Sequence, residues 1–313
     1  MGALDGRAVI VVGGAGGAGS GFSRVFAAEG ARVLVNDVGY AMLPDSGDYD
    51  LSAPGRAEAD RIAREIRLNG GISEADYENA ADSAAARRIV EHCLDVFGRV
   101  DAVIHAANVS RLGMIEQLSD GDWDVVIRQN LYPIFYLTRE TLPLMKRQAF
   151  GRHIYLGSAT VREMWGGANY AAASGAIYSF MRSVALECKG SGITANSIEP
   201  WTQTKTGQRP RGQQMLRDRQ RALGLPDAPA ASLPPGDTNA PLGAYLCTEA
   251  GSLFNGQYFS NRCGRICIFS TPLEQRYLYK NTEQNGEWTV SELARLMPEA
   301  MRGGIQPLWH PRD

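Results

Sequence analysis

The segment VVGGAGGAGSG at residues 11–21 constrains the fold of this chain most, because it joins an apolar β-branched run to the start of a predicted helix. Its glycines satisfy two overlapping spacings, GxGxxG and GxxxGxG, through Gly13, Gly14, Gly16, Gly17 and Gly19. Glycine lets the backbone turn sharply and approach a pyrophosphate, whose charge then lies at the N-terminus of the following helix. A glycine-rich turn can also be only a tight turn. The flanking strand and helix favour a dinucleotide-binding turn, with Gly13, Gly16, Gly17 and Gly19 at the cofactor.

Asp37 follows the second apolar run, 18 residues after Gly19, where a dinucleotide-binding fold carries the acid that binds ribose hydroxyls. A carboxylate at this position repels a 2′-phosphate, and the neighbouring Asn36 supplies no positive charge to offset it. The sequence therefore favours NAD over NADP. Asp82, in AADSAA, could meet the adenine, and it could equally be the N-cap of a helix over 83–97.

Short apolar runs alternate with helical patterns, which is typical of strands covered on both faces and joined by right-handed crossovers. The predicted strands are 8–14, 31–37, 100–107, 151–158 and 192–200. The predicted helices are 20–29, 57–69, 83–97, 122–147 and 169–189. This alternation predicts an α/β fold with a doubly wound, Rossmann-like parallel sheet.

We expect one dinucleotide-binding domain over 1–270, followed by a C-terminal extension over 271–313. The segment 256–270 is predicted to be a last strand, bulged at Gly264. The extension contains one amphipathic helix candidate, VSELARLMPEAM at 290–301.

The composition excludes several classes of partner. With 32 Lys and Arg against 34 Asp and Glu, the net charge is −2, so no nucleic acid partner is expected. Five scattered cysteines without a CxxC pair favour free thiols in a reducing cytoplasm, and four distant histidines support no metal site. No apolar run approaches the roughly 18 residues of a membrane span, so a soluble, cytoplasmic protein is expected.

Together these features resemble the short-chain dehydrogenase/reductase family over roughly residues 5–270. The segments that carry the resemblance, in the family's order and spacing, are GGAGGAG, VNDVG, FGRVDAVIHAAN, DWDVVIRQNL, GRHIYLGS, ANYAAAS and GITANSIEP. The combination of VNDVG, ANYAAA and FNGQYFSNRCGRICIF is similar to the (3R)-hydroxyacyl-CoA and hydroxysteroid dehydrogenases related to the multifunctional enzymes of β-oxidation. The resemblance implies an NAD-linked oxidoreductase that acts on a secondary alcohol or ketone.

The resemblance also assigns catalytic roles to three residues. It implies that Tyr170 gives or takes the substrate proton, that Ser158 holds the substrate oxygen, and that Asn130 supports a water chain. Each residue also has a plainer interpretation. Tyr170 could be an ordinary half-buried tyrosine, Ser158 a strand-end hydroxyl, and Asn130 a polar core residue beside Pro133.

Several positions depart from the family's pattern. The family's lysine falls on Ser174, its turn threonine falls on Val12, and its Asn-Asn-Ala-Gly segment falls on HAAN at 105–108. Asn108 therefore adds a side chain where the family has glycine. Asn108, Ser174 and Thr204 complete the set of expected cofactor-binding residues.

The loss of the lysine has an estimable chemical cost. In the family, the lysine binds the nicotinamide ribose, and its charge lowers the pKa of the catalytic tyrosine. A cation about 4 Å from a phenolate, at an effective dielectric near 20, contributes about 4 kcal/mol. Its loss could therefore slow the reaction about a hundredfold to a thousandfold. Ser174 cannot replace that charge.

The segment 201–240 stands where the family places a substrate lid, after the predicted strand 192–200. Between 201 and 223 this segment has one acid, Asp218, and six cations, namely Lys205, Arg209, Arg211, Arg217, Arg219 and Arg221. Positive charge at the mouth of a site would attract an anionic substrate such as a coenzyme A thioester. A solvated charged helix is the alternative.

Three functions remain open for this sequence. The leading hypothesis is NAD-linked oxidation or reduction of an acyl-CoA or steroid-like substrate. The second is a noncatalytic subunit that lends helices 122–147 and 169–189 to an intact partner, and these helices would also form a homo-oligomer. The third is a dehydratase, lyase or cyclase that uses Tyr170 as a proton donor and Ser158 as an oxyanion partner.

Overall fold

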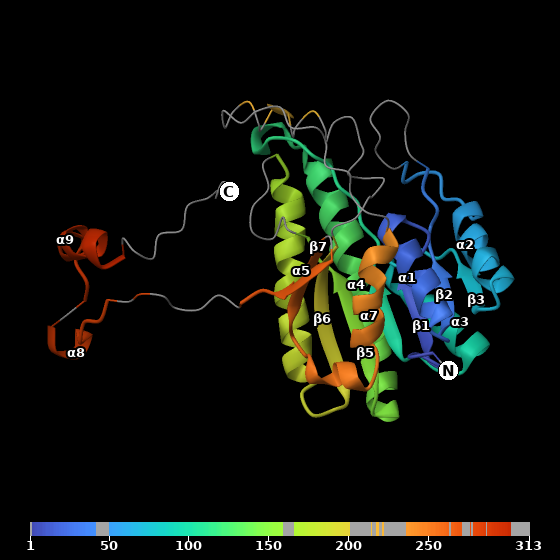
Figure 1. The fold of residues 1–313 in the computed structure, drawn as a ribbon. Helices are drawn as coiled ribbons and strands as arrows, with labels where there is room; N and C mark the ends of the chain where they lie inside the picture. The colour runs from blue at the N-terminus through green and yellow to red at the C-terminus, as the bar shows by residue number, and fades with distance from the viewer. Residues whose placement is uncertain are drawn as a thin grey trace. The chain divides into compact units, whose positions relative to one another are not determined.

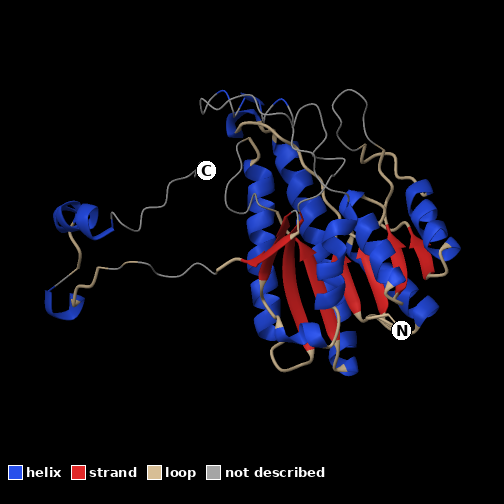
Figure 2. Cartoon of the chain, viewed as in Figure 1, coloured by secondary structure: helices blue, strands red, loops and turns tan. Residues whose placement is uncertain are grey.

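Eight strands form one sheet in the order β3-β2-β1-β4-β5-β6-β7-β8 (Figures 1 and 2). Their bounds are β1 (Ala8–Val12), β2 (Arg32–Asn36), β3 (Ile72–Asp76), β4 (Ala102–His105), β5 (Gly151–Leu156), β6 (Ile193–Pro200), β7 (Tyr258–Arg262) and β8 (Arg265–Ile268). Strands β1 to β7 are parallel, and β8 runs antiparallel to β7. The predicted fold class, a doubly wound Rossmann-like sheet, is confirmed.

This computed structural model describes residues 2–41, 50–158, 166–200, 214, 217–218, 221, 236–262, 264–270, 276, 278–285 and 287–301. The chain divides into two compact units, Met1–Phe269 and Ser270–Asp313.

Helices cover both faces of the sheet in the first unit (Figure 1). One face packs against α1 (Gly17–Ala28), α2 (Ala57–Leu68) and α7 (Ala240–Leu246), and the other against α3 (Ser83–Phe97), α4 (Asp120–Gln148) and α5 (Ala168–Glu187). The described part of this unit also contains the short 3₁₀ turns η1 (Ile115–Gln117), η3 (Gly236–Asn239) and η4 (Ala250–Leu253).

The apolar residues of the strands alternate between two cores. Val9 and Val11 of β1 pack with Phe22 and Phe26 of α1, whereas Ile10 belongs to the core under α3, α4 and α5. Each fully buried side chain of this kind contributes about 1.5–3 kcal/mol. The continuous apolar runs in the sequence therefore correspond to strands that are covered on both sides.

The last predicted strand differs from the structure. The prediction of a single strand over 256–270 is wrong, because the segment folds back on itself as the hairpin of β7 and β8, with Phe259 opposite Ile268. Gly264 has a φ of 84°, in the left-handed region where glycine is favoured. The glycine therefore forms part of a tight reversal, and not a bulge within one continuous strand.

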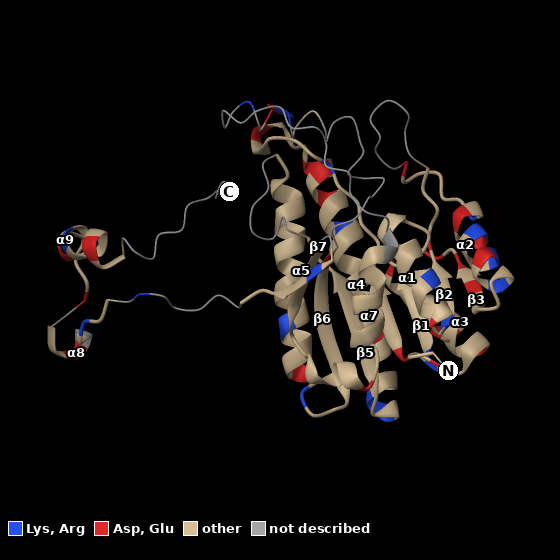
Figure 3. Ribbon diagram, in the orientation of Figure 1, with Lys and Arg blue, Asp and Glu red and all other residues tan. Residues whose placement is uncertain are grey.

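Charged residues lie mainly on the outer helices. In Figure 3, acidic and basic residues are interspersed along α2, while the central strands are nearly free of red and blue. Arg24 of α1 donates to Glu65 of α2 at 2.7 Å, and this pair joins the two helices at the surface. Among the described residues, no helix is long and apolar enough to cross a bilayer.

The second unit contains α8 (Thr282–Asn285) and α9 (Val290–Met301), the latter over the range of the predicted amphipathic helix. Thr289 caps α9, because its hydroxyl accepts from the backbone N–H of Glu292 at 3.2 Å. The Glu292 carboxylate in turn accepts from the N–H of Thr289 and from Lys280. These bonds to Thr289 and Lys280 lower the pKa of Glu292 to about 2.

Candidate active site

The glycine turn lies between β1 and α1, next to β4, where the order of the strands reverses. Gly13 has a φ of 73°, and a Cβ there would lie 2.6 Å from the Cα of Ala107. A Cβ on Gly19 would lie only 2.0 Å from the carbonyl oxygen of Gly13. The turn therefore needs glycine at both positions, the first for its conformation and the second because α1 packs directly onto it.

The start of α1 has the features of an anion site. Gly16 is the N-cap, it offers no capping side chain, and a Cβ on it would meet only the Gly13 carbonyl, at 3.2 Å. Gly17 is the first helical residue. Backbone N–H groups at such a helix start attract a phosphate. The predicted glycine residues therefore fit the pyrophosphate of a dinucleotide.

Replacing Gly19 by alanine should destabilise the protein, and the matched change at Gly175 should not. Both glycines are helical, but a Cβ at Gly175 would meet no atom within 4 Å, whereas the one at Gly19 would overlap backbone atoms. We expect Gly19→Ala to lower the free energy of unfolding by about 1–3 kcal/mol, and Gly175→Ala to raise it by about 0.5–1 kcal/mol. Urea unfolding measures both. Equal stabilities for the two variants would contradict this account.

Asp37 lies against the glycine turn. Its carboxylate accepts from the backbone N–H of Ala15 at 3.0 Å and from that of Gly39 at 2.8 Å. Asn36 is buried and donates to the Asp76 carboxylate at 2.7 Å. The structure thus holds a carboxylate beside the turn, in the position where the sequence predicts the acidic residue that binds the ribose hydroxyls.

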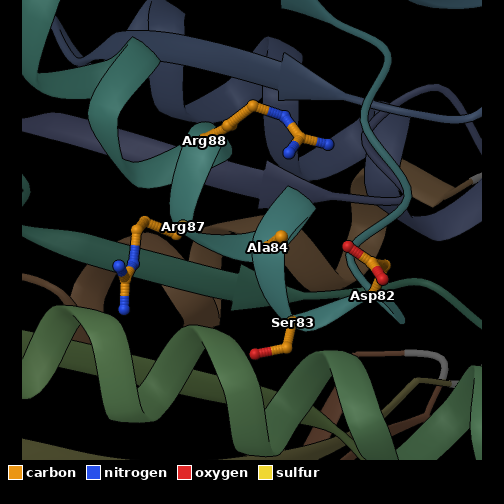
Figure 4. A pocket seen from close by; sticks show the side chains of 5 residues that line it. All are labelled: Asp82, Ser83, Ala84, Arg87 and Arg88. Atoms are coloured by element: carbon orange, nitrogen blue, oxygen red, sulfur yellow. The ribbon is translucent and has the colours of Figure 1, made fainter.

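Asp82 is the N-cap of α3 and accepts from the backbone N–H of Ala85 at 2.8 Å. It lies at an open depression of about 510 Å³ (Figure 4). The residues that line this depression are Asp82, Ser83, Ala84, Arg87 and Arg88. Arg88 is paired with Glu78 at 2.8 Å, so much of its charge is already neutralised. The alternative that Asp82 is the N-cap of this helix is therefore confirmed, and its contact with the adenine stays a prediction.

The structure brings Tyr170 and Asn108 together. Tyr170 lies in the first turn of α5, Asn108 follows β4, and the Asn108 side-chain N–H donates to the Tyr170 hydroxyl. Ser174 lies one turn after Tyr170 and is buried, with 4% of its surface exposed. Ser158 follows β5 and is half-buried. The helix α5 thus carries both the tyrosine and the serine that occupies the lysine position.

Asn130, on α4, holds the chain just after Asn108. Its side-chain oxygen accepts from the backbone N–H of Val109 at 2.8 Å, and its amide donates to the Val109 carbonyl at 2.7 Å. Asn130 is only 3% exposed. The amide therefore satisfies both backbone groups of one loop residue, which is consistent with a polar core residue. A role in a water chain stays a prediction.

Two residues near Ser158 were not singled out in the sequence. The Tyr258 hydroxyl of β7 donates to the Ser158 carbonyl at 2.9 Å and lies 3.3 Å from the Glu199 carboxylate. Glu199, near the end of β6, is only 1% exposed. A Cβ on Gly157 would lie 3.0 Å from the Tyr258 ring, so glycine lets the tyrosine approach. The sequence signal for Glu199 was a single acidic residue in the predicted strand GITANSIEP, because a buried glutamate in a strand needs a polar partner.

A buried pair of histidines lies under α4. The Nε2 atom of His105, on β4, lies 3.3 Å from the Nδ1 atom of His153, on β5. The His105 ring also stacks on the Tyr155 ring, with 4.7 Å between the ring centroids. Burial lowers the pKa of His153 to about 3 and holds that of His105 well below its usual range. Both rings are therefore neutral core residues.

Thr204, most of the predicted lid at 201–240 and most of its basic segment lie outside the described residues. In the part of the chain that the structure does describe, no group of three or more His, Cys, Asp or Glu side chains could hold a metal ion.

Comparison with known proteins gives consistent matches. The family model "short chain dehydrogenase" matches residues 51–214. The mouse peroxisomal multifunctional enzyme type 2 is 36% identical over 198 residues, which cover 63% of this chain but only 26% of that enzyme. The 3-oxoacyl-[acyl-carrier-protein] reductase of Synechocystis is 31% identical over 201 residues, covering 64% of this chain and 75% of the reductase.

A solved structure matches nearly the whole chain. The crystal structure of a short chain dehydrogenase from Mycobacterium avium has a TM-score of 0.77 and 26% sequence identity, and it covers 98% of both chains. This chain therefore corresponds in length to that protein, whereas it spans about a quarter of the mouse enzyme.

Proposed function

Because this chain belongs to the short-chain dehydrogenase/reductase family, we propose that it binds NAD(H) and oxidises or reduces a secondary alcohol or ketone of an acyl-CoA or steroid-like substrate. Tyr170 acts as the acid and base of this reaction, and Ser158 binds the substrate oxygen.

One observation carries the proposal: a glycine turn with a carboxylate and a hydrogen-bonded tyrosine both lie at the carboxyl edge of one parallel sheet. The Asp37 carboxylate accepts from the N–H of Ala15 within the turn. The Tyr170 hydroxyl is held by Asn108, which follows the neighbouring strand β4. Ligands of such sheets bind at this edge, where the strand order reverses. A nicotinamide cofactor therefore has both an anion site and a proton-transfer group within the same region.

The cofactor, when bound, supplies or accepts the hydride. In the oxidising direction, Tyr170 as phenolate takes the proton of the substrate hydroxyl, and in the reducing direction its hydroxyl returns that proton to the new alkoxide. The Ser158 hydroxyl donates to the substrate oxygen and fixes its position. The Tyr258 hydroxyl holds the Ser158 carbonyl at 2.9 Å and so positions this serine.

A thioester substrate is supported by two observations. The Synechocystis relative is named as a reductase of 3-oxoacyl groups on acyl carrier protein. The sequence also places six cations between 201 and 223, in the segment that the family uses as a lid. Cations at the mouth of a site favour a ligand with several phosphates, such as coenzyme A.

The buried Ser174 favours a second candidate, a noncatalytic subunit. It stands one turn from Tyr170, where the family has a lysine, and is 4% exposed. Large apolar side chains lie exposed on the two helices that would meet a partner, with Phe135 of α4 at 44% and Leu186 of α5 at 73%. A heteromeric assembly would place a partner with an intact Tyr-Lys pair against α4 and α5. Co-purification with such a relative would favour this candidate, and activity of the isolated chain would exclude it.

We predict that NADH binds at least about tenfold more tightly than NADPH, and that Asp37→Ala removes the difference. The carboxylate beside the turn repels a 2′-phosphate, and loss of its charge relieves the repulsion. Asp37→Asn is the matched control, because it keeps the side-chain shape without the charge and should also bind the two cofactors more equally. Fluorescence titration of the purified protein with NADH and NADPH measures the affinities. Equal affinity of the wild-type protein for both cofactors would contradict the assignment of Asp37.

A further inference from the structure

Asn108 makes a side-chain contact that a glycine at position 108 could not make. Its side-chain N–H donates to the hydroxyl of Tyr170, which lies 62 residues later on α5. This hydrogen bond is made by the side-chain amide, so a residue without a side chain at position 108 would lose it.

The backbone around Asn108 is fixed on both sides. Before it, the N–H of Ala106 donates to the Val12 carbonyl at 2.9 Å, which continues the pairing of β4 with β1. After it, both backbone groups of Val109 are bound by the buried Asn130, at 2.8 and 2.7 Å. Only residues 107 and 108 lie between the anchored residues Ala106 and Val109. The backbone path between these anchors therefore directs the Asn108 side chain toward Tyr170.

The chemistry of this contact depends on the protonation state of the tyrosine. An amide N–H stabilises an oxygen that carries negative charge more than a neutral one, because hydrogen bonds to charged groups are stronger. In the family a lysine gives this stabilisation, and here Ser174 stands at the lysine position. The carboxamide also has an acceptor oxygen, so a half-turn about χ2 lets the same side chain accept from the neutral tyrosine.

We propose that Asn108 is a positioning residue that stabilises the phenolate of Tyr170 and so takes over part of the role of the absent lysine. The catalytic part of this proposal rests on the proposed function, whereas the effect on the tyrosine does not. Its contribution is smaller than that of a cation, because the amide is neutral and Asn108 is exposed to solvent.

The experiment compares Asn108→Asp and Asn108→Ala with the wild-type protein. Asparagine to aspartate keeps the shape but replaces the donor by a carboxylate, and alanine removes both groups. Ultraviolet difference titration, with Tyr170→Phe subtracted as the baseline, follows Tyr170 alone among 12 tyrosines. We expect the midpoint of Tyr170 to move to higher pH in both variants, and further in Asn108→Asp. Asn69→Asp, at the exposed C-terminus of α2 on the opposite face of the sheet, is the charge control and should leave the midpoint unchanged.

The pH profile of dehydrogenation is the second measurement. Near neutral pH, the activity of Asn108→Ala should fall about three- to tenfold and recover at high pH, where the phenolate forms without help. A shifted titration in a chain without dehydrogenase activity would support the effect of Asn108 and contradict the proposed function. An unchanged midpoint in both Asn108 variants, with the fold intact by circular dichroism, would overturn the inference whether or not the chain is active.

Discussion

Replacing Ser174 by lysine is expected to raise dehydrogenase activity near neutral pH by about a hundredfold to a thousandfold. Tyr170 and Ser174 lie one helical turn apart on α5, so a lysine at 174 would place its charge near the tyrosine hydroxyl. A cation there lowers the pKa of Tyr170, because it stabilises the phenolate by about 4 kcal/mol at an effective dielectric near 20. The wild-type rate should instead rise steeply with pH as phenolate forms.

The matched control is Ser174→Met, which adds a side chain of similar length without a charge. Ser174 is buried, so both substitutions must find room for a long side chain, and only the lysine variant should gain activity. The measurement is the pH profile of each protein with NAD and a panel of hydroxyacyl-CoA and hydroxysteroid substrates. If the lysine variant binds NAD and keeps its fold but gains no activity at any pH, the lost-lysine account is wrong. The noncatalytic and non-redox hypotheses would then remain.

Mild acid should destabilise the protein strongly through His105 and His153. Burial holds the pKa of His153 at about 3 and lowers that of His105, whereas both would titrate near 6.5 when unfolded. The unfolded chain therefore binds more protons below pH 6.5, so the stability due to these rings is complete above that pH. It is lost as the pH falls toward the folded pKa values. Two such groups cost up to about 3 kcal/mol per pH unit once the unfolded rings are protonated, and about 3 kcal/mol in total between pH 6.5 and 5, because the unfolded rings are only half protonated at pH 6.5.

The variant that tests this is His105→Asn, which removes one titrating ring. Its overall stability will fall, because the ring stacked on Tyr155 is lost, but that loss does not depend on pH. The part of the slope of stability against pH between 5 and 6.5 that comes from the two buried rings should therefore halve, since of these two only His153 remains. Urea unfolding at several pH values in this window, above the range where carboxylates titrate, gives the slope. An identical slope in both proteins would show that these histidines do not carry the acid sensitivity.

The parts of the fold that follow local rules could be predicted from the sequence. Glycine spacing, β-branched runs and helix caps act over a few residues, so the turn at β1, the strands β1, β2, β4, β5 and β6 and the range of α3 agree with the structure. Strand β3 (Ile72–Asp76) was not predicted, because its sequence ISEAD has no continuous apolar run. The β7–β8 hairpin was missed because one glycine can serve as a bulge or as a reversal. Which of the two forms depends on whether the residues on either side of the glycine pair with each other, as Phe259 does with Ile268. Local sequence patterns do not determine that pairing.

The candidate site was predictable to the extent that each residue follows a strand or opens a helix. What the sequence could not supply is contact across distance. Asn108 meets Tyr170 over 62 residues, and the Tyr258 hydroxyl reaches the Ser158 carbonyl over 100 residues. The charge of Glu199 is visible in its strand, but its proximity to Tyr258 depends on the parallel pairing of β6 with β7.

The clamp of Asn130 on Val109 has a consequence for how such a site can change. Hydrogen bonds hold the main chain at Ala106 and at Val109, and none of these bonds involves the side chain of residue 108. The side chain at 108, which is exposed, can therefore be replaced while these bonds are kept. A single replacement at 108 therefore exchanges one hydrogen-bond donor for another group at the Tyr170 hydroxyl, while the anchored main chain on either side stays in place.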